Sequence, residues 1–157
     1  MEDAIIINKS SIERGFGRSF FLRSYSVEEK RYFGIERDEI KIPDKSVQGY
    51  RTEEAYSILG EDGVINRETR VKAGDVLVGR VSPLRFFGQS ESLMVGIENR
   101  RETSETVRYG EEGIVDNVLV TETISGDKII KIVVRSERNP EIGDKFETDN
   151  YLYYFIS

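Results

Sequence analysis

Two apolar runs around one tight turn constrain the fold of this chain more than any other feature. The runs cover residues 113–124 and 128–135, are rich in valine and isoleucine, and flank Ser125-Gly126-Asp127. Glycine and aspartate favour tight turns, and β-branched side chains pack well on a pleated sheet. This stretch therefore predicts a long β-hairpin.

Shorter strand candidates cover residues 4–7, 18–27, 76–78 and 100–109. The second has Phe20, Leu22 and Tyr25 as packing candidates. A Gly74-Asp75 turn leads into the third, and Ser82-Pro83 ends it. Many short strands with Gly-Asp turns indicate a mainly β fold, with a barrel-like or sandwich-like β-rich core and short helices.

Two short helices are expected. Ser10 and Glu13 have the spacing of a capping box, which predicts one helical turn over 11–14. Thr52 can cap a second helix that runs to Leu59, with Ala55, Ile58 and Leu59 facing inward.

Composition excludes several classes of chemistry. The 157 residues include no cysteine and no histidine, so disulfides, thiolate metal sites and imidazole bases are all excluded. A formal net charge of -6 argues against an autonomous nucleic-acid binder, which usually carries a basic face. No apolar run is long enough to span a membrane, and we expect a cytoplasmic protein with no membrane partner.

Two apolar segments are candidate contact surfaces. The loop 84–92 contains Phe86 and Phe87, which either face a partner or anchor the loop. The run 151–156 is aromatic and aliphatic, and it predicts an edge strand that could associate with another chain.

Glu2 and Asp3 place two carboxylates just before the strand 4–7. Magnesium commonly binds one or two carboxylates together with substrate phosphates. However, adjacent strand residues point to opposite faces, so at most one of the two can face a given ligand directly. The plainer alternative is that both are ordinary solvated residues.

Lys9, Arg14 and Arg18 put positive charge around the first helix. They could hold a phosphate backbone, or they could simply balance neighbouring acids such as Glu13. These three residues are the candidate nucleic-acid contacts of this part of the chain.

A turn is predicted directly before a lysine near the C-terminus. Residues 139–146 read Asn-Pro-Glu-Ile-Gly-Asp-Lys-Phe. Pro140 cannot donate to a sheet ladder, and Gly143-Asp144 is typical of tight turns. Lys145 is therefore predicted just past the turn. The plain interpretation is a strand, a turn and an exposed lysine.

Four strings in the chain carry a family resemblance. They are Met-Glu-Asp-Ala-Ile-Ile-Ile-Asn-Lys-Ser-Ser-Ile-Glu-Arg-Gly at 1–15, Gly-Tyr-Arg-Thr-Glu-Glu-Ala-Tyr at 49–56, Arg-Arg-Glu-Thr-Ser at 100–104 with Val107-Arg108, and the string at 139–146. In this order they resemble the second-largest (B or β-type) subunit of multisubunit DNA-directed RNA polymerases, in its archaeal form. The resemblance implies a β core of the hybrid-binding region at 1–27 and 100–146, with a wall-like or flap-like insertion at 28–99.

The same resemblance implies roles for three residues. Glu2 and Asp3 match an acidic pair that helps to place the second magnesium, directly or through water, and the incoming nucleoside triphosphate. Lys145 matches a lysine that approaches RNA phosphates near the growing 3′ end. The implied partners are the largest subunit, other polymerase subunits, the DNA template and the RNA–DNA hybrid. Mg²⁺ would be shared with the largest subunit, so we expect the isolated chain to be an inactive part of a nucleotidyltransferase.

The last residues depart from the family pattern. The family continues after Lys145-Phe146 with Ala-Ser-Arg-His-Gly-Gln-Lys-Gly, whereas residues 147–157 bear no likeness to that string. This departure suggests a subunit fragment with an unrelated tail. It also motivates an alternative, a stand-alone β interaction module of the same descent with no catalytic role. An independent magnesium enzyme would need a third ligand and a base, and neither can be named.

Overall fold

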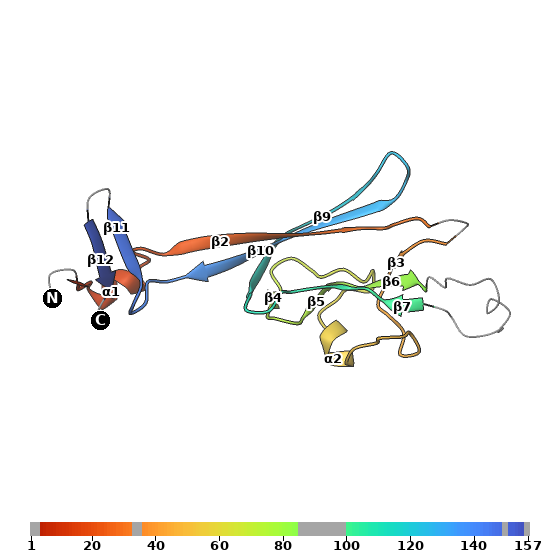
Figure 1. The fold of residues 1–157 in the computed structure, drawn as a ribbon, viewed down its shortest axis with the longest axis horizontal. Coiled ribbons are helices and arrows are strands. Elements are labelled where there is room, and N and C mark those ends of the chain that lie inside the picture. The colour runs from red at the N-terminus through yellow and green to blue at the C-terminus, as the bar shows by residue number, and fades with distance from the viewer. Residues whose placement is uncertain (1–3, 33–35, 85–99, 149–150, 156–157) are drawn as a thin grey trace. The chain divides into compact units, whose positions relative to one another are not determined.

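The structure is a computed structural model that describes residues 4–32, 36–84, 100–148 and 151–155. The chain divides into two compact units (Figure 1). Unit 1 combines Met1–Phe21 with Ser136–Ser157, and unit 2 is Leu22–Arg135. The predicted loop with Phe86 and Phe87 lies outside the described residues.

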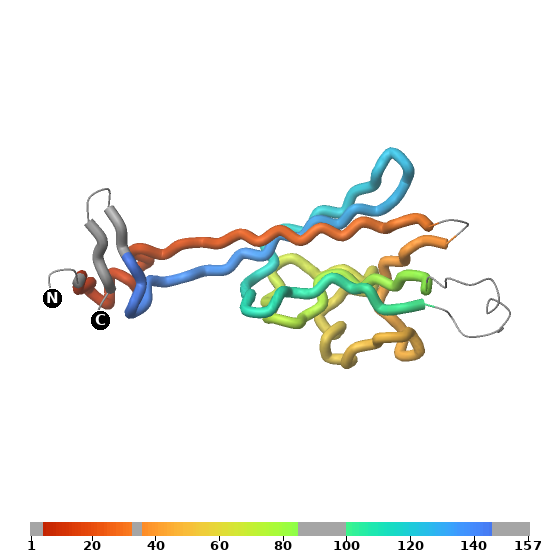
Figure 2. The backbone as a smooth tube through the Cα atoms, in the orientation of Figure 1, coloured from red at the N-terminus to blue at the C-terminus, as the bar shows by residue number. Residues whose placement is uncertain are grey.

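The predicted hairpin forms the largest sheet. Its order is β2-β10-β9-β4, with β2 at Ser19–Glu28, β10 at Lys128–Arg138, β9 at Gly113–Glu122 and β4 at Arg70–Val71. β9 and β10 pair antiparallel from Lys128↔Glu122 onward and run alongside each other (Figure 2). A register shift between Val133 and Val134 interrupts the ladder. The hairpin prediction is confirmed.

Two smaller sheets complete the strands of unit 2. One has the order β3-β6-β7, and the other pairs β5 with β8. Their bounds are β3 Glu39–Ile40, β5 Val76–Val78, β6 Arg80–Pro83, β7 Arg100–Glu102 and β8 Glu105–Thr106. The predicted strand over 100–109 is therefore two short strands in different sheets. The prediction that Ser82-Pro83 ends the strand starting at Val76 was wrong, because that strand stops at Val78 and both residues belong to β6. The mainly β fold is confirmed.

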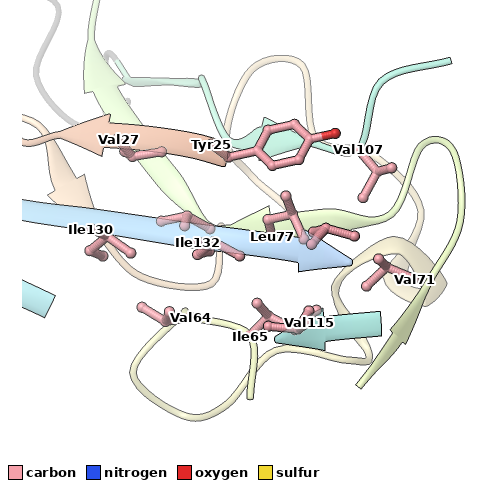
Figure 3. Packing of buried hydrophobic residues seen from close by; sticks show 12 residues of the cluster. Tyr25, Val27, Val64, Ile65, Val71, Leu77, Val107, Val115, Ile130 and Ile132 are labelled. Atoms are coloured by element: carbon pink, nitrogen blue, oxygen red, sulfur yellow. The ribbon is translucent and has the colours of Figure 1, made fainter. Parts of the chain in front are cut away.

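The core of unit 2 lies among these sheets (Figure 3). Tyr25 and Val27 of β2 are buried, but Phe20 and Leu22 are 58% and 60% exposed. The prediction that all three of Phe20, Leu22 and Tyr25 pack inward was wrong, because alternate strand residues face opposite sides and even-numbered positions share the outer face. The buried cluster comprises Tyr25, Val27, Val64, Ile65, Val71, Leu77, Val78, Val107, Val115, Ile130, Ile132 and Val134.

Unit 1 contains a three-stranded sheet and a short helix. The sheet order is β1-β12-β11, with β1 at Ala4–Ile5, β12 at Tyr151–Phe155 and β11 at Lys145–Thr148. β12 pairs parallel with β1 and antiparallel with β11. The expectation of an edge strand at 151–156 was wrong, because both sides of β12 are hydrogen-bonded.

Both helices are real but differ from the predictions. α1 spans Lys9–Glu13 and begins after Asn8, not after Ser10. α2 spans Glu53–Tyr56 and stops short of Leu59, although Ile58 and Leu59 still pack against the core. Neither Asn8 nor Thr52 makes a side-chain capping bond to any described residue. No helix in the described part of the chain is long and apolar enough to cross a membrane.

Candidate nucleic-acid interface

The turn before Lys145 is closed by the side chain and backbone of Asp144. The Asp144 N–H donates to the Glu141 carbonyl at 3.1 Å, and Asp144 Oδ2 accepts the Glu141 N–H at 2.9 Å. Asp144 Oδ1 accepts a hydrogen bond from the Arg138 guanidinium. Gly143 has φ +93°, a conformation that only glycine adopts without strain. The predicted Gly-Asp turn is confirmed, and Lys145 follows it as the exposed first residue of β11.

The segment between α1 and β2 fixes the start of this turn. Arg18 Nε lies 2.8 Å from Glu137 Oε1 and donates to Asn139 Oδ1 at 3.1 Å. A Cβ added to Gly17 would lie 2.8 Å from Pro140 Cγ, so the backbone approaches the proline ring closely. Arg18 therefore links the segment before β2 to Glu137 and Asn139 within unit 1. Its binding of nucleic acid stays a prediction.

Strand pairing brings the two ends of the sequence together in unit 1. Tyr154 is the Cα partner of Ala4 on one side and of Lys145 on the other. Neighbouring strands lie about 4.8 Å apart, so the backbones of Ala4 and Lys145 are roughly 10 Å apart across β12. Ala4 directly follows Asp3 in the sequence. Glu2 and Asp3 themselves lie outside the described residues.

The other predicted basic contacts lie at α1. Lys9 is largely exposed and lies 4.0 Å from Glu13 one helical turn later. Arg14 follows the helix and is exposed. An exposed pair of this kind is worth little and is readily exchanged for another anion. Lys9 and Arg14 therefore remain candidates for phosphate binding.

A groove of about 740 Å³ lies between α1 and the turn. Its apolar lining is Ile7, Ile12, Pro140 and Ile142, and its charged rim is Lys9, Glu13 and Glu141. The mixture of apolar walls and opposite charges gives it no preference for an anion. It is not a phosphate site.

A resident metal site is not built by the described residues. They contain no group of three or more histidine, cysteine, aspartate or glutamate side chains that could hold a metal ion. Glu2 and Asp3 remain the candidate ligands.

Sequence reasoning missed two features of this interface. It did not predict the ion pair between Arg138 and Asp144 or the ion pair between Arg18 and Glu137. No local signal pointed to the first, because the Gly-Asp pattern at residues 72–75 and 141–144 predicts a turn before a strand but not an arginine partner.

Comparison with known proteins identifies the family. RNA polymerase Rpb2, domain 6, matches residues 1–149. The chain belongs to this family and corresponds to part of the second-largest subunit of RNA polymerase, which confirms the predicted resemblance.

Individual relatives come from archaea and eukaryotes. The DNA-directed RNA polymerase subunit Rpo2 of Sulfolobus acidocaldarius is 51% identical over 148 residues, which are 94% of this chain and 13% of that protein. DNA-directed RNA polymerase II subunit 2 of Arabidopsis thaliana is 40% identical over 151 residues, 94% of this chain and 12% of that protein. Subunit RPB2 of Schizosaccharomyces pombe is 37% identical over 145 residues, with shares of 92% and 12%. The chain thus spans about an eighth of the length of these relatives.

Proposed function

We propose that this chain lines the active centre of a DNA-directed RNA polymerase, near the RNA–DNA hybrid. In this role Lys145 contacts RNA phosphates, while Glu2 and Asp3 help to position the incoming nucleoside triphosphate and a second Mg²⁺. The wall-like region at 28–99 belongs to the same subunit, and the assembly works in the cytoplasm.

One observation carries the proposal beyond family membership. The register Ala4↔Tyr154↔Lys145 puts the residue after Asp3 and the lysine on one row of the unit 1 sheet. The backbone at Ala4 and the lysine are about two strand spacings apart, a separation that fits a substrate whose phosphates bind both the lysine and a metal ion.

The chemistry is shared with other parts of the assembly. In this proposal the largest subunit supplies the principal Mg²⁺ ligands, and the described residues of this chain contain no group of three or more carboxylate, histidine or cysteine side chains that could hold a metal ion. When bound, Mg²⁺ supplies charge neutralisation for the triphosphate. The contributions of this chain are orientation of the nucleotide and a positive point charge for the RNA backbone, which carries no sequence information.

Lys145→Ala in the complete polymerase tests the RNA contact. We expect faster loss of nascent RNA from stalled elongation complexes on every template sequence. The slope of the logarithm of RNA retention against the logarithm of salt concentration should become shallower by roughly 0.7 to 0.9, the range for one phosphate contact on a single strand or a duplex. Lys131→Ala is the matched control, because Lys131 is an exposed lysine on β10 of unit 2. Unchanged retention and salt dependence in Lys145→Ala would refute the assignment.

Asp3→Ala tests the proposed nucleotide and metal role separately. The apparent requirement for nucleoside triphosphate or Mg²⁺ should rise, while assembly of the polymerase stays normal. If Asp3 only supports the local fold, assembly or thermal stability will fall and both concentration requirements will stay as in the wild type.

A further inference from the structure

We propose that Arg138 and Asp144 are positioning residues for Lys145. The pair sets the direction in which β11 begins and neutralises the carboxylate beside the lysine. This inference rests on the proposed function, because it presupposes that Lys145 binds RNA phosphate.

A second turn in the chain shows what the Gly-Asp pattern does without an arginine. At residues 72–75, Asp75 Oδ2 accepts the Lys72 N–H at 2.9 Å and the Asp75 N–H donates to the Lys72 carbonyl at 3.1 Å. Gly74 has φ +91°, and β5 begins immediately afterward at Val76. The two turns therefore share their backbone closure. Closing such a turn requires glycine and aspartate only.

The Arg138 contact is an addition specific to the second turn. Its guanidinium reaches Asp144 across six residues and joins the last residue of β10 to the residue before β11. The Arg138 carbonyl also accepts a bond from Ser19 Oγ at 3.4 Å. The backbone of Arg138 is thus bonded to the start of β2, and its side chain is bonded to Asp144 in the turn. Arg138 therefore fixes the turn relative to the start of β2.

Charge gives the pair a second effect. A carboxylate next to Lys145 opposes the approach of an RNA phosphate, because like charges repel over the distances involved. Arg138 offsets this repulsion by pairing with Asp144. Val76, which follows the matching aspartate in unit 2, has an uncharged side chain and is fully buried. The turn with the arginine is the one that precedes an exposed lysine.

The two effects predict an order among variants. Arg138→Ala leaves the Asp144 charge unpaired beside the phosphate site, so RNA retention should fall roughly two- to fivefold, the range for an exposed ion pair. Asp144→Asn removes the same ion pair but also the opposing charge, and its side-chain oxygen still accepts the Glu141 N–H. It should therefore cost less than Arg138→Ala. Combining Arg138→Ala with Asp144→Asn should restore part of what Arg138→Ala alone loses.

The experiment measures release of nascent RNA from stalled elongation complexes of the complete polymerase, at several salt concentrations. The variants are Arg138→Ala, Asp144→Asn and their combination, each with and without Lys145→Ala. Asp75→Asn is the control for a turn of the same geometry in unit 2. We expect the order above with Lys145 present, no further loss once Lys145 is replaced, and wild-type retention for Asp75→Asn.

The outcomes separate the two proposals. If Lys145→Ala retains RNA as the wild type does, the proposed function is refuted and the positioning role with it. If Lys145→Ala weakens retention but Arg138→Ala does not, the positioning inference alone is overturned. It is also overturned if the loss from Arg138→Ala persists in full when Lys145 is replaced, since that would indicate a general structural effect.

Discussion

The backbone at Lys41 and Ile42 packs closely against two glycines, and replacing either glycine should destabilise unit 2 by a predictable amount. The Lys41 N–H donates to the Gly79 carbonyl at 3.1 Å, and the Gly79 N–H donates to the Gly63 carbonyl at 2.8 Å. A Cβ at Gly63 would lie 2.8 Å from Lys41 Cα and from its carbonyl carbon, and a Cβ at Gly79 would clash with the Lys41 carbonyl oxygen. Both obstacles are backbone atoms, which cannot rotate away.

Three alanine substitutions separate steric overlap from backbone strain. Gly79→Ala adds overlap without a positive φ and should cost about 2 kcal/mol, within the range for overpacking. Gly74→Ala adds the strain of φ +91° but meets no described atom within 4 Å, so it should cost about 1 kcal/mol. Gly63 combines overlap with φ +77°, and Gly63→Ala should cost roughly the sum, about 3 kcal/mol.

Urea unfolding of the chain, followed by far-UV circular dichroism, gives the three free energies of unfolding by linear extrapolation. The expected order is Gly63→Ala, then Gly79→Ala, then Gly74→Ala. The reasoning is refuted if Gly79→Ala lies within about 0.5 kcal/mol of the wild type, the range of an ordinary surface change. It is also refuted if Gly74→Ala is the most damaging of the three.

Three further predictions concern the core and the polar contacts of unit 2. Ile132 is 1% exposed in the core, so Ile132→Ala should lower the free energy of unfolding by about 2–5 kcal/mol in the same urea assay. A decrease below about 1 kcal/mol would contradict the packing. The hydroxyl of the buried Tyr25 donates to Glu111, so Tyr25→Phe should lower the free energy of unfolding by about 1–3 kcal/mol. An unchanged free energy of unfolding would show that the bond does not stabilise the fold. Hydrogen bonding from Ser125 and the charge of Arg31 lower the pKa of Asp127. The stability from Asp127 is therefore complete above the ordinary aspartate pKa of about 3.9 and is lost as the pH falls through the lowered pKa; Asp127→Asn should flatten this acid dependence in unfolding curves measured across it.

Local pattern predicted the elements that depend on neighbours in sequence. The hairpin at 113–135 follows from β-branched runs around Ser125-Gly126-Asp127, because both its strands and its turn are encoded within about two dozen residues. The turn at 141–144 follows in the same way from Gly143 and Asp144. Helix ends were less accurate, since α1 and α2 have no side-chain cap among the described residues that could specify their boundaries.

Burial of a strand residue could be predicted only where the sequence shows which face of the strand meets the core. Tyr25 was correctly assigned to the core, but Phe20 and Leu22 of the same strand are exposed. The sequence of β2 is apolar on both faces near its start, so alternation alone cannot say which face meets the core. That choice depends on which segments pack over the sheet, and the buried residues Val64, Ile65, Leu77 and Val78 belong to the same core cluster as Tyr25 and Val27.

The candidate site shows the same division. Lys145 was correctly placed after a turn from local sequence. Its place on one row with Ala4 was not predictable, because each of the two residues pairs with Tyr154 of the intervening strand and not with the other. From its charge, Arg18 was predicted either to contact phosphate or to balance nearby acids, while the structure adds its bond to Asn139 and its ion pair with the distant Glu137.

By itself, the sequence determined the family, the mainly β class, the hairpin and the Gly-Asp turn before Lys145. Each of these depends on short strings of residues, within which every residue influences only its near neighbours in sequence. Tertiary structure alone decided that β12 is central in its sheet, that Ala4 and Lys145 share a row, and that the backbone of Lys41 packs closely against Gly63 and Gly79. These features arise where segments distant in sequence compete for the same space and the same hydrogen bonds, and no local pattern records the outcome of that competition.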